Sequence, residues 1–357
     1  MTDLLYSETE TDLRAAVRSL LSDHADPAAL VAGAAESGSP YDAGLWKALA
    51  SDIGAAGLLV PEKLGGQGAS HREAAVVLEE LGRSVAPAPY LTSSVIATEV
   101  LLALGDVSGD VTALLGDLAA GRRTAVAALP LSAADGLPAG DAGRVTGVAD
   151  AVRADVFLVL RADGLYLLER SEVSVEPQTA LDLTRPLAAV TPGPAGTRVA
   201  DRDAGEAAMR RGLLAGAGLL ASEQLGVAEW CLEETVRHTR ERHQFNRPIG
   251  SFQALKHRMA QLWLEVVSAR AAARAAADAL ATGSPDAAVA VAVAQAYCSR
   301  VAVHAAEECV QLHGGIGMTW EHPAHLYLKR AKADEIALGT PGRHKEVLAA
   351  LVDLQAP

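Results

Sequence analysis

The sequence predicts an α+β protein in three parts: an N-terminal helical domain, a small central β-domain and a C-terminal helical bundle. Two observations predict this class. Apolar residues recur at three and four positions up to about residue 120, and again from about 205 to 354, which is the period of a helix. Between about 121 and 200, apolar alternation broken by Gly and Asp turns is typical of short strands. We therefore place the domains at 1–120, 121–204 and 205–357.

Each part is supported by its own segments. In the first, the stretches 12–25 and 72–85 carry the helical repeat, and Gly and Pro residues between 61 and 89 interrupt it. In the second, the alternating segments lie at 122–129, 144–152, 155–170 and 186–192. In the third, Ala-, Leu- and Glu-rich stretches are interrupted at 246–250, 282–285 and 314–317. Long helices with such short connections predict an antiparallel bundle.

Composition limits the possible functions. The chain has 357 residues, 50% of them hydrophobic, so it can bury a large core without disulfides. A formal net charge of -13 argues against nucleic-acid binding. The three cysteines, Cys231, Cys298 and Cys309, lie in helical stretches outside any CxxC spacing, which indicates reduced core residues of a cytoplasmic protein. The acidic N-terminus predicts no signal peptide, and the apolar stretch 286–298 is too short to predict a transmembrane helix.

Two segments carry residues suited to a nucleotide. The first, 242–253, joins two predicted helices and contains Arg242, Phe245 and Gln253. A guanidinium can hold a pyrophosphate, a phenyl ring can cover an adenine, and an amide can contact a polar edge. The second, 311–317, follows a predicted helix and contains three glycines in four positions, which expose backbone amides to a phosphate or a ring. Taken singly, either segment can also be a plain helix connection.

In combination these segments resemble the acyl-CoA dehydrogenase family, and the match extends over almost the whole chain. The resemblance also rests on the segment 60–68 (VPEKLGGQG), on EELGR at 79–83 and on Gly339-Thr340. It implies the family's fold, with an N-terminal helical domain, a central β-domain and a C-terminal four-helix domain. It further implies an FAD-dependent oxidation of an acyl-CoA to the 2,3-enoyl-CoA, with an acceptor similar to electron-transfer flavoprotein.

The resemblance assigns residues to the FAD. Those that match positions reaching across a subunit interface to the neighbour's cofactor are Arg242, Phe245, Ile249, Gln253, Gln311, Gly314 and Gly315. Thr340 matches a residue that contacts the cofactor from its own subunit.

The catalytic base of the family is missing from both of its known positions. The reaction needs a carboxylate to remove the α-proton, and the two matching positions hold Leu338 and Gly216. Glu223, seven residues after Gly216, lies about 10 Å further along the same helix face and is the remaining candidate base, against a structural role in a polar helix contact. Asp334 and Glu335 have Lys329, Arg330 and Lys332 nearby, which favours ordinary ion pairing.

The central domain also departs from the family. Its acidic flavin-loop segment is not recognisable, and no tryptophan lies between 121 and 200, although 181–186 (LDLTRP) is retained. We therefore expect a short, actinobacterial-type member resembling the non-catalytic subunit of α2β2 acyl-CoA dehydrogenases, which act in steroid and other bulky acyl-CoA degradation. Two alternatives stay open: a homomeric enzyme with Glu223 as base, and a scaffold or binding protein without redox chemistry.

Metal binding is not expected. His322 and His325 are three apart on a possible helix, and no Glu or Cys near them in sequence completes a ligand set. GxSxG, P-loop and strand-linked GxGxxG motifs are not found in the sequence, which leaves hydrolase, NTPase and nicotinamide readings unsupported.

Overall fold

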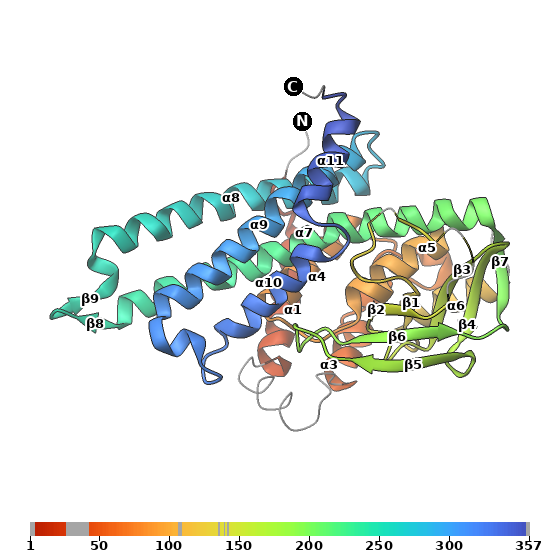
Figure 1. The fold of residues 1–357 in the computed structure, drawn as a ribbon, viewed down its shortest axis with the longest axis horizontal. Coiled ribbons are helices and arrows are strands. Elements are labelled where there is room, and N and C mark those ends of the chain that lie inside the picture. Colours follow the sequence, from red (N-terminus) through yellow and green to blue (C-terminus); the bar gives the residue numbers. More distant parts are fainter. Residues whose placement is uncertain are drawn as a thin grey trace.

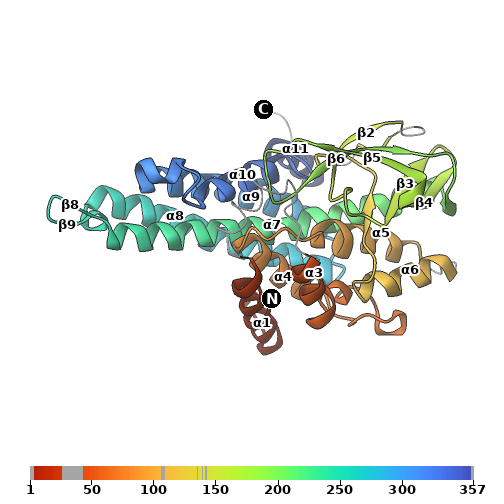
Figure 2. The same cartoon turned by 90° about the horizontal axis from the view of Figure 1, so that it is seen from below.

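One helix of 40 residues, α7 (Arg202–Glu241), runs the length of the molecule in the computed structural model, which describes residues 4–25, 43–105, 109–134, 136–138, 140 and 143–354. The β-domain lies on one side of α7 and the N-terminal helices on the other (Figure 2). The Asp201 side chain caps the start of α7 by accepting a hydrogen bond from the Ala204 amide at 2.8 Å. All three parts of the chain are therefore organised around this helix.

The N-terminal part is a set of short helices. Its α-helices are α1 (Glu8–His24), α3 (Ala43–Lys47), α4 (His71–Arg83), α5 (Thr98–Ala103) and α6 (Gly109–Ala119). Tighter or wider turns lie between them, at η1 (Ala48–Asp52), η2 (Ala55–Gly57), η3 (Glu62–Leu64) and η4 (Tyr90–Ala97). Helices α1 and α4 each begin with a capping box, in which a serine and a glutamate three residues later satisfy the first backbone amides.

The central part contains two small sheets. The first has the order β1 (Ala125–Ala127), β3 (Val156–Arg161), β4 (Gly164–Glu169) and β7 (Thr197–Asp201). The second has the order β2 (Val145–Ala149), β6 (Leu187–Pro192) and β5 (Val173–Gln178), with η5 (Arg170–Glu172) before it. Among the strand pairs of the described residues, β1–β3 is parallel and the others are antiparallel. The alternating strands supply a separate apolar core that includes Val126, Val148, Phe157, Leu168 and Val190.

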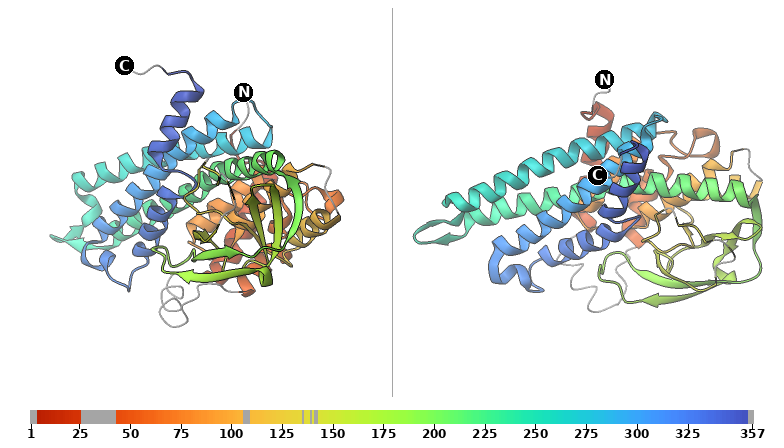
Figure 3. Two further views of the ribbon diagram at one scale, coloured as in Figure 1. Left: turned by 45° about the vertical axis from the view of Figure 1, so that its right-hand side comes forward. Right: turned by 45° about the horizontal axis from the view of Figure 1, so that its top comes forward.

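The C-terminal part is a bundle of long helices. Helices α8 (Gln253–Ala281), α9 (Ala287–His313) and α10 (Ala324–Ile336) pack with α7, and α11 (Pro341–Leu351) packs on α9 (Figures 1 and 3). The hairpin β8 (His243–Gln244) and β9 (Arg247–Pro248) with η6 (Ile249–Ser251) joins α7 to α8, and η7 (Gly314–Met318) follows α9. The stretch Ala287–Met318 is long and apolar enough to cross a membrane, but 56% of its most apolar window is buried inside the protein, as in a core helix.

Two glycines allow α4 and α7 to cross in close contact. A methyl group built on Gly226 would lie 1.9 Å from the Glu79 carbonyl oxygen, and one on Gly82 would lie 2.1 Å from the Glu223 carbonyl oxygen. Gly82 belongs to the EELGR segment. The backbone contact with α7 therefore requires a glycine at this position. The two glutamates of the segment, Glu79 and Glu80, bind Arg14 of α1.

The predicted α+β class is confirmed. Each of the four alternating segments contains a strand, whereas β5 and β7 lie outside them. Helix α6 ends at Ala119 and α7 begins at Arg202, and the domain limits at 120 and 204 stay predictions.

Candidate functional site

The predicted nucleotide segments meet at one end of the bundle. Helix α7 ends at Glu241, and Arg242 leaves it in an extended conformation that starts the β8–β9 hairpin. Phe245 and Asn246 form the turn with positive φ values of 52° and 61°, a conformation that asparagine tolerates better than phenylalanine does. Gln253 then starts α8, and Ile249 lies half-buried between the hairpin and that helix.

The glycine segment lies at the same end (Figures 1 and 2). Helix α9 ends at His313 because Gly314 takes a φ of +64°. Methyl groups built on Gly314 or Gly315 would meet no atom within 4 Å, so the backbone here is open to an approaching molecule. We call the exposed set formed by Arg242, Phe245, Gln253, Gln311, Gly314 and Gly315 the bundle-end surface.

The bundle-end surface has unused binding groups. Phe245 is 85% exposed, touching only the edge of Phe252 with ring centroids 6.0 Å apart. The Arg242 guanidinium makes no hydrogen bond or ion pair within the described part of the chain, whereas the nearby Arg237 pairs with Glu234 and Glu241. An exposed ring, an unpaired guanidinium and a sterically open glycine backbone fit an aromatic, phosphate-bearing group such as FAD.

Thr340 is separate from this surface. It caps the start of α11, its hydroxyl accepting a hydrogen bond from the Arg343 amide at 3.2 Å, and α11 lies away from the hairpin end of the bundle (Figure 1). The structure therefore divides the predicted cofactor residues into two places, the bundle-end surface and the start of α11.

The two family positions for the base face each other. A methyl group on Gly216 would lie 3.2 Å from Leu338 Cδ1 and 2.6 Å from Ile96 Cγ1. Leu338 is 3% exposed and has a φ of +53°, with its amide donating to the Leu131 carbonyl at 2.7 Å. At the two positions where the family carries its catalytic glutamate, this chain therefore has an apolar side chain, Leu338, and a residue without a side chain, Gly216.

A cavity of about 260 Å³ adjoins Leu338. Its walls come from α7, α9 and α11 and are mostly apolar, with arginines and one histidine as the polar groups. Its lining residues include Arg210, Leu213, Val291, Leu338, Arg343 and His344. No carboxylate is among the residues that line it in the described part of the chain.

Glu223 lies elsewhere, in a cluster of fully buried charges. Its carboxylate accepts hydrogen bonds from Arg185 at 2.7 Å and from Arg330 at 2.6 Å, and it is 1% exposed. Burial acts to raise the pKa of Glu223, but the two guanidinium groups outweigh it and lower the pKa. A buried carboxylate held by two arginines is a poor proton acceptor, and Glu223 lines neither the 260 Å³ cavity nor the interdomain cavity described below.

Asp334 belongs to the same cluster. We expected its partner on its own helix, but Asp334 accepts a hydrogen bond at 2.7 Å from Arg185 of the central domain. The expected ion pairing is present for Glu335, which pairs with Lys332. Asp334 also forms an ion pair, but with an arginine of another domain, because α10 turns this carboxylate inward. Burial and the charge of Glu223 raise the pKa of Asp334 well above its usual value. We call Asp182, Arg185, Glu223, Arg330 and Asp334 the buried ion cluster.

An interdomain cavity of about 460 Å³ lies between the β-domain and α10. The buried ion cluster reaches it through two of its members, so the cluster forms part of the cavity wall. Lining residues include Leu131, Thr146, Asp182, Arg185, Lys332 and Ile336. The retained segment 181–186 is thus explained by packing, since it supplies both the cavity wall and the arginine that holds Glu223.

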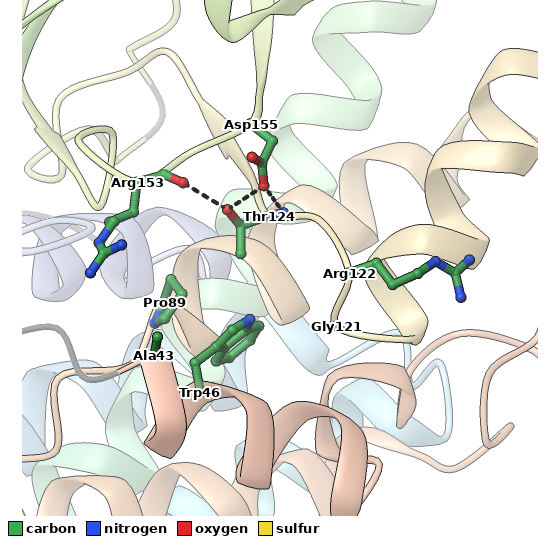
Figure 4. Close-up of a pocket in the computed structure, with 8 residues that line it drawn as sticks. All are labelled: Ala43, Trp46, Pro89, Gly121, Arg122, Thr124, Arg153 and Asp155. Carbon is green, nitrogen blue, oxygen red and sulfur yellow. Dashed lines mark hydrogen bonds between the residues drawn. The ribbon is translucent and has the colours of Figure 1, made fainter.

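A further cavity of about 170 Å³ lies beside Trp46 (Figure 4). Thr124 there donates to the Arg153 carbonyl and to Asp155. None of the residues that line this cavity was predicted from the sequence to bind cofactor or substrate.

The sequence interpretation missed a third group, at the bundle end. His322 precedes α10 instead of lying on it with His325, and its Nε2 is 3.4 Å from Glu234 Oε1. We expected no Glu or Cys to complete a metal set around His322 and His325, and that expectation stays a prediction. Glu234 is 88 positions from His322 in the sequence, and only the fold brings it near. His313 Nε2 approaches the same oxygen at 3.5 Å.

Comparison with known proteins gives one consistent family. Two family models match, described as the acyl-CoA dehydrogenase N-terminal domain over residues 7–108 and the C-terminal domain over 203–352. The chain is 39% identical to acyl-CoA dehydrogenase IpdE2 of Mycolicibacterium smegmatis over 94% of this chain and 96% of that protein.

Solved structures agree. The chain is similar to a chain of the ChsE4-ChsE5 complex from Mycobacterium tuberculosis, with a TM-score of 0.85, 26% identity and 100% of both chains covered. It is also similar to a variant of the steroid ACAD Tcur3481-Tcur3483, with a TM-score of 0.83, 29% identity, and 97% of this chain and 98% of that one covered. The family resemblance inferred from the motifs is confirmed.

Proposed function

Because the chain belongs to the acyl-CoA dehydrogenase family, we propose that it is the subunit that completes the flavin site of a catalytic partner in an α2β2 enzyme. The reaction is the α,β-dehydrogenation of an acyl-CoA to the 2,3-enoyl-CoA, in which bound FAD supplies the hydride acceptor. The similarity to a two-component complex and to a steroid ACAD supports a second subunit and a bulky, steroid-type acyl group.

The apolar contact between Leu338 and Gly216 carries the proposal. Removal of an α-proton requires a base within hydrogen-bond reach of the substrate, and this point offers a leucine methyl group against a glycine. A chain that retains cofactor-binding groups but no base at this point is suited to serve a site whose base lies on another chain.

The bundle-end surface is the part of this chain that would bind the FAD of the partner's site. Arg242 would hold the FAD pyrophosphate, Phe245 would cover the adenine, and the open backbone at Gly314 and Gly315 would let the same group approach closely. Each of these residues is exposed in the isolated chain. Their function is to bind and orient the cofactor, while the proton is removed by a base of the partner.

Glu223 as a relocated base has less support. Its two arginine partners lower its pKa, and it is buried away from the cavity beside Leu338. A scaffold without redox chemistry would have no need for the unpaired Arg242 and the exposed Phe245 together.

An arginine substitution in the co-purified complex tests the proposal. Arg242→Ala removes a charge-assisted contact to phosphate worth about 1.5–3 kcal/mol, so FAD affinity should fall by about 10- to 100-fold. Arg240→Ala is the matched control, since Arg240 is also exposed and lies two residues earlier on α7. Equal FAD retention by both variants would contradict the assigned role.

A further inference from the structure

Three polar side chains converge at the bundle end, and one of their nitrogens, His313 Nε2, has no hydrogen-bond partner in the described part of the chain. Glu234 comes from α7, His313 from the last turn of α9 and His322 from the connection before α10. One potential ligand atom from each lies within 4.8 Å of the other two. The His313 and His322 rings are 4.3 Å apart between centroids.

The His313 ring faces the carboxylate with its Nε2 atom. Its Nδ1 donates to the Cys309 carbonyl at 2.6 Å, so Nε2 is the nitrogen that either carries a second proton or offers its lone pair to a metal ion. That Nε2 is buried without a hydrogen-bond partner, and the side chain is 0% exposed. A buried imidazole nitrogen 3.5 Å from a carboxylate oxygen requires a proton or a metal ion between the two atoms.

Two of the three distances match those between ligands of one metal ion. Atoms bound about 2.0–2.2 Å from a tetrahedral zinc lie about 3.3–3.6 Å from one another. Glu234 Oε1 is 3.5 Å from His313 Nε2 and 3.4 Å from His322 Nε2. The Nδ1–H of His313 on a backbone carbonyl is also the arrangement that orients metal-binding histidines.

We propose that Glu234, His313 and His322 form a binding site for a divalent transition metal ion of the zinc type, with water in the fourth position. Two imidazoles and one carboxylate are a ligand set that zinc accepts. The ion would link α7 to both ends of the α9–α10 connection, and so hold the glycine segment that begins at Gly314.

The surrounding groups are compatible with a cation. Arg237 donates to both oxygens of Glu234, to Oε2 at 2.8 Å and to Oε1 at 2.5 Å. Metal binding through Oε1 therefore requires the Arg237 side chain, which is 55% exposed and also pairs with Glu241, to give up its contact with that oxygen. His238 packs its ring against His313 with centroids 4.2 Å apart. Binding through His322 Nε2 requires its Nδ1 to carry a proton, so the 3.2 Å contact from the Ala324 amide is given up.

A proton is the competing occupant. Burial lowers the pKa of His313, but the contacts with Cys309 and Glu234 outweigh it and raise the pKa to about 10. One proton can satisfy His313 and Glu234, whereas a metal ion would satisfy all three groups. The two occupants therefore predict different effects of removing His322. A metal ion needs His322 as a ligand, whereas a proton shared by His313 and Glu234 does not.

Cobalt titration of the full chain separates them. Metal-stripped protein is titrated with Co²⁺ near pH 7.5 and followed by visible absorption, with Zn²⁺ displacement as the second step. We expect one saturable site with the visible band of tetrahedral cobalt, and a rise in melting temperature on adding Zn²⁺. His322→Ala and Glu234→Gln should each weaken the affinity by at least about 100-fold, more than loss of an outer contact does.

His325→Ala is the matched control. It lies in the same segment, contacts Trp320 and contributes no atom to the set, so Co²⁺ affinity should stay within about 2-fold. Absence of saturable Co²⁺ binding to the folded wild-type chain would overturn the proposal and leave a protonated histidine. Binding that His322→Ala and Glu234→Gln leave unchanged would overturn it too.

Discussion

Replacing Gly226 with alanine tests the close crossing of α4 and α7. The new methyl group would lie 1.9 Å from the Glu79 carbonyl oxygen and 2.8 Å from the Arg83 amide nitrogen, both on backbone that cannot rotate away. Reaching an ordinary contact of 3.4 Å requires the helices to separate by about 1.5 Å, the difference between 3.4 and 1.9 Å. Overpacking of this kind costs about 3 kcal/mol or more, against about 1 kcal/mol gained from alanine's helix propensity.

The expected net loss is therefore about 2 kcal/mol or more in the free energy of unfolding. Gly116→Ala is the control, because Gly116 lies inside α6 and a methyl group there would be 3.5 Å from the Leu64 carbonyl oxygen, an ordinary contact. That substitution should be neutral or stabilise by up to about 1 kcal/mol. Urea unfolding of both variants measures the difference, and equal stability of the two would refute the packing argument.

Three further predictions concern buried polar groups. Glu223→Gln should destabilise the protein by about 3–5 kcal/mol, since it leaves Arg185 and Arg330 with a neutral partner; a variant of unchanged stability that loses α-proton exchange would restore Glu223 as the base. Tyr327→Phe should cost about 1 kcal/mol, because it removes the hydrogen bond to the Arg83 carbonyl but keeps the stack on Trp230; denaturation that fails to distinguish it from wild type would contradict this. Burial and the charge of Glu229 raise the pKa of Glu79 from 4.5 to about 7. At a pH between these two pKa values, Glu79 is ionised in the unfolded chain but still protonated in the folded protein. The free energy of unfolding therefore falls as the pH rises through this range. Wild type should therefore lose stability relative to Glu79→Gln as the pH rises from 5 to 8, and a constant difference in unfolding free energy would exclude the raised pKa.

Local patterns in the sequence were sufficient to predict the fold class and the two segments that form the bundle-end surface. Helical repeats and strand alternation depend on neighbours a few residues apart, and the segments holding Arg242 and Gly314 each form a continuous turn. The fold then brings both turns to one end, as the antiparallel order of α7, α8 and α9 requires.

The buried clusters could not be derived in this way. Glu223 meets Arg185 across 38 positions and Arg330 across 107, and no periodicity relates residues that far apart in different domains. The metal-type set has the same character, since His322 lies outside the helix and its glutamate is on α7. The signal that was available was the retained LDLTRP segment, whose arginine needed an acidic partner once the chain was folded.

The measurement that bears most directly on the account is flavin content and reduction of this chain alone and with its partner. The account predicts that the chain purified alone holds little FAD, because its bundle-end surface serves the cofactor of a partner. It also predicts that an acyl-CoA does not reduce the isolated chain, because a carboxylate is missing at Leu338 and Gly216. Co-purified with a family member that carries the glutamate, it should form a complex with FAD that acyl-CoA bleaches. Stoichiometric FAD in the isolated chain, reduced by an acyl-CoA without any partner, would contradict the central claim.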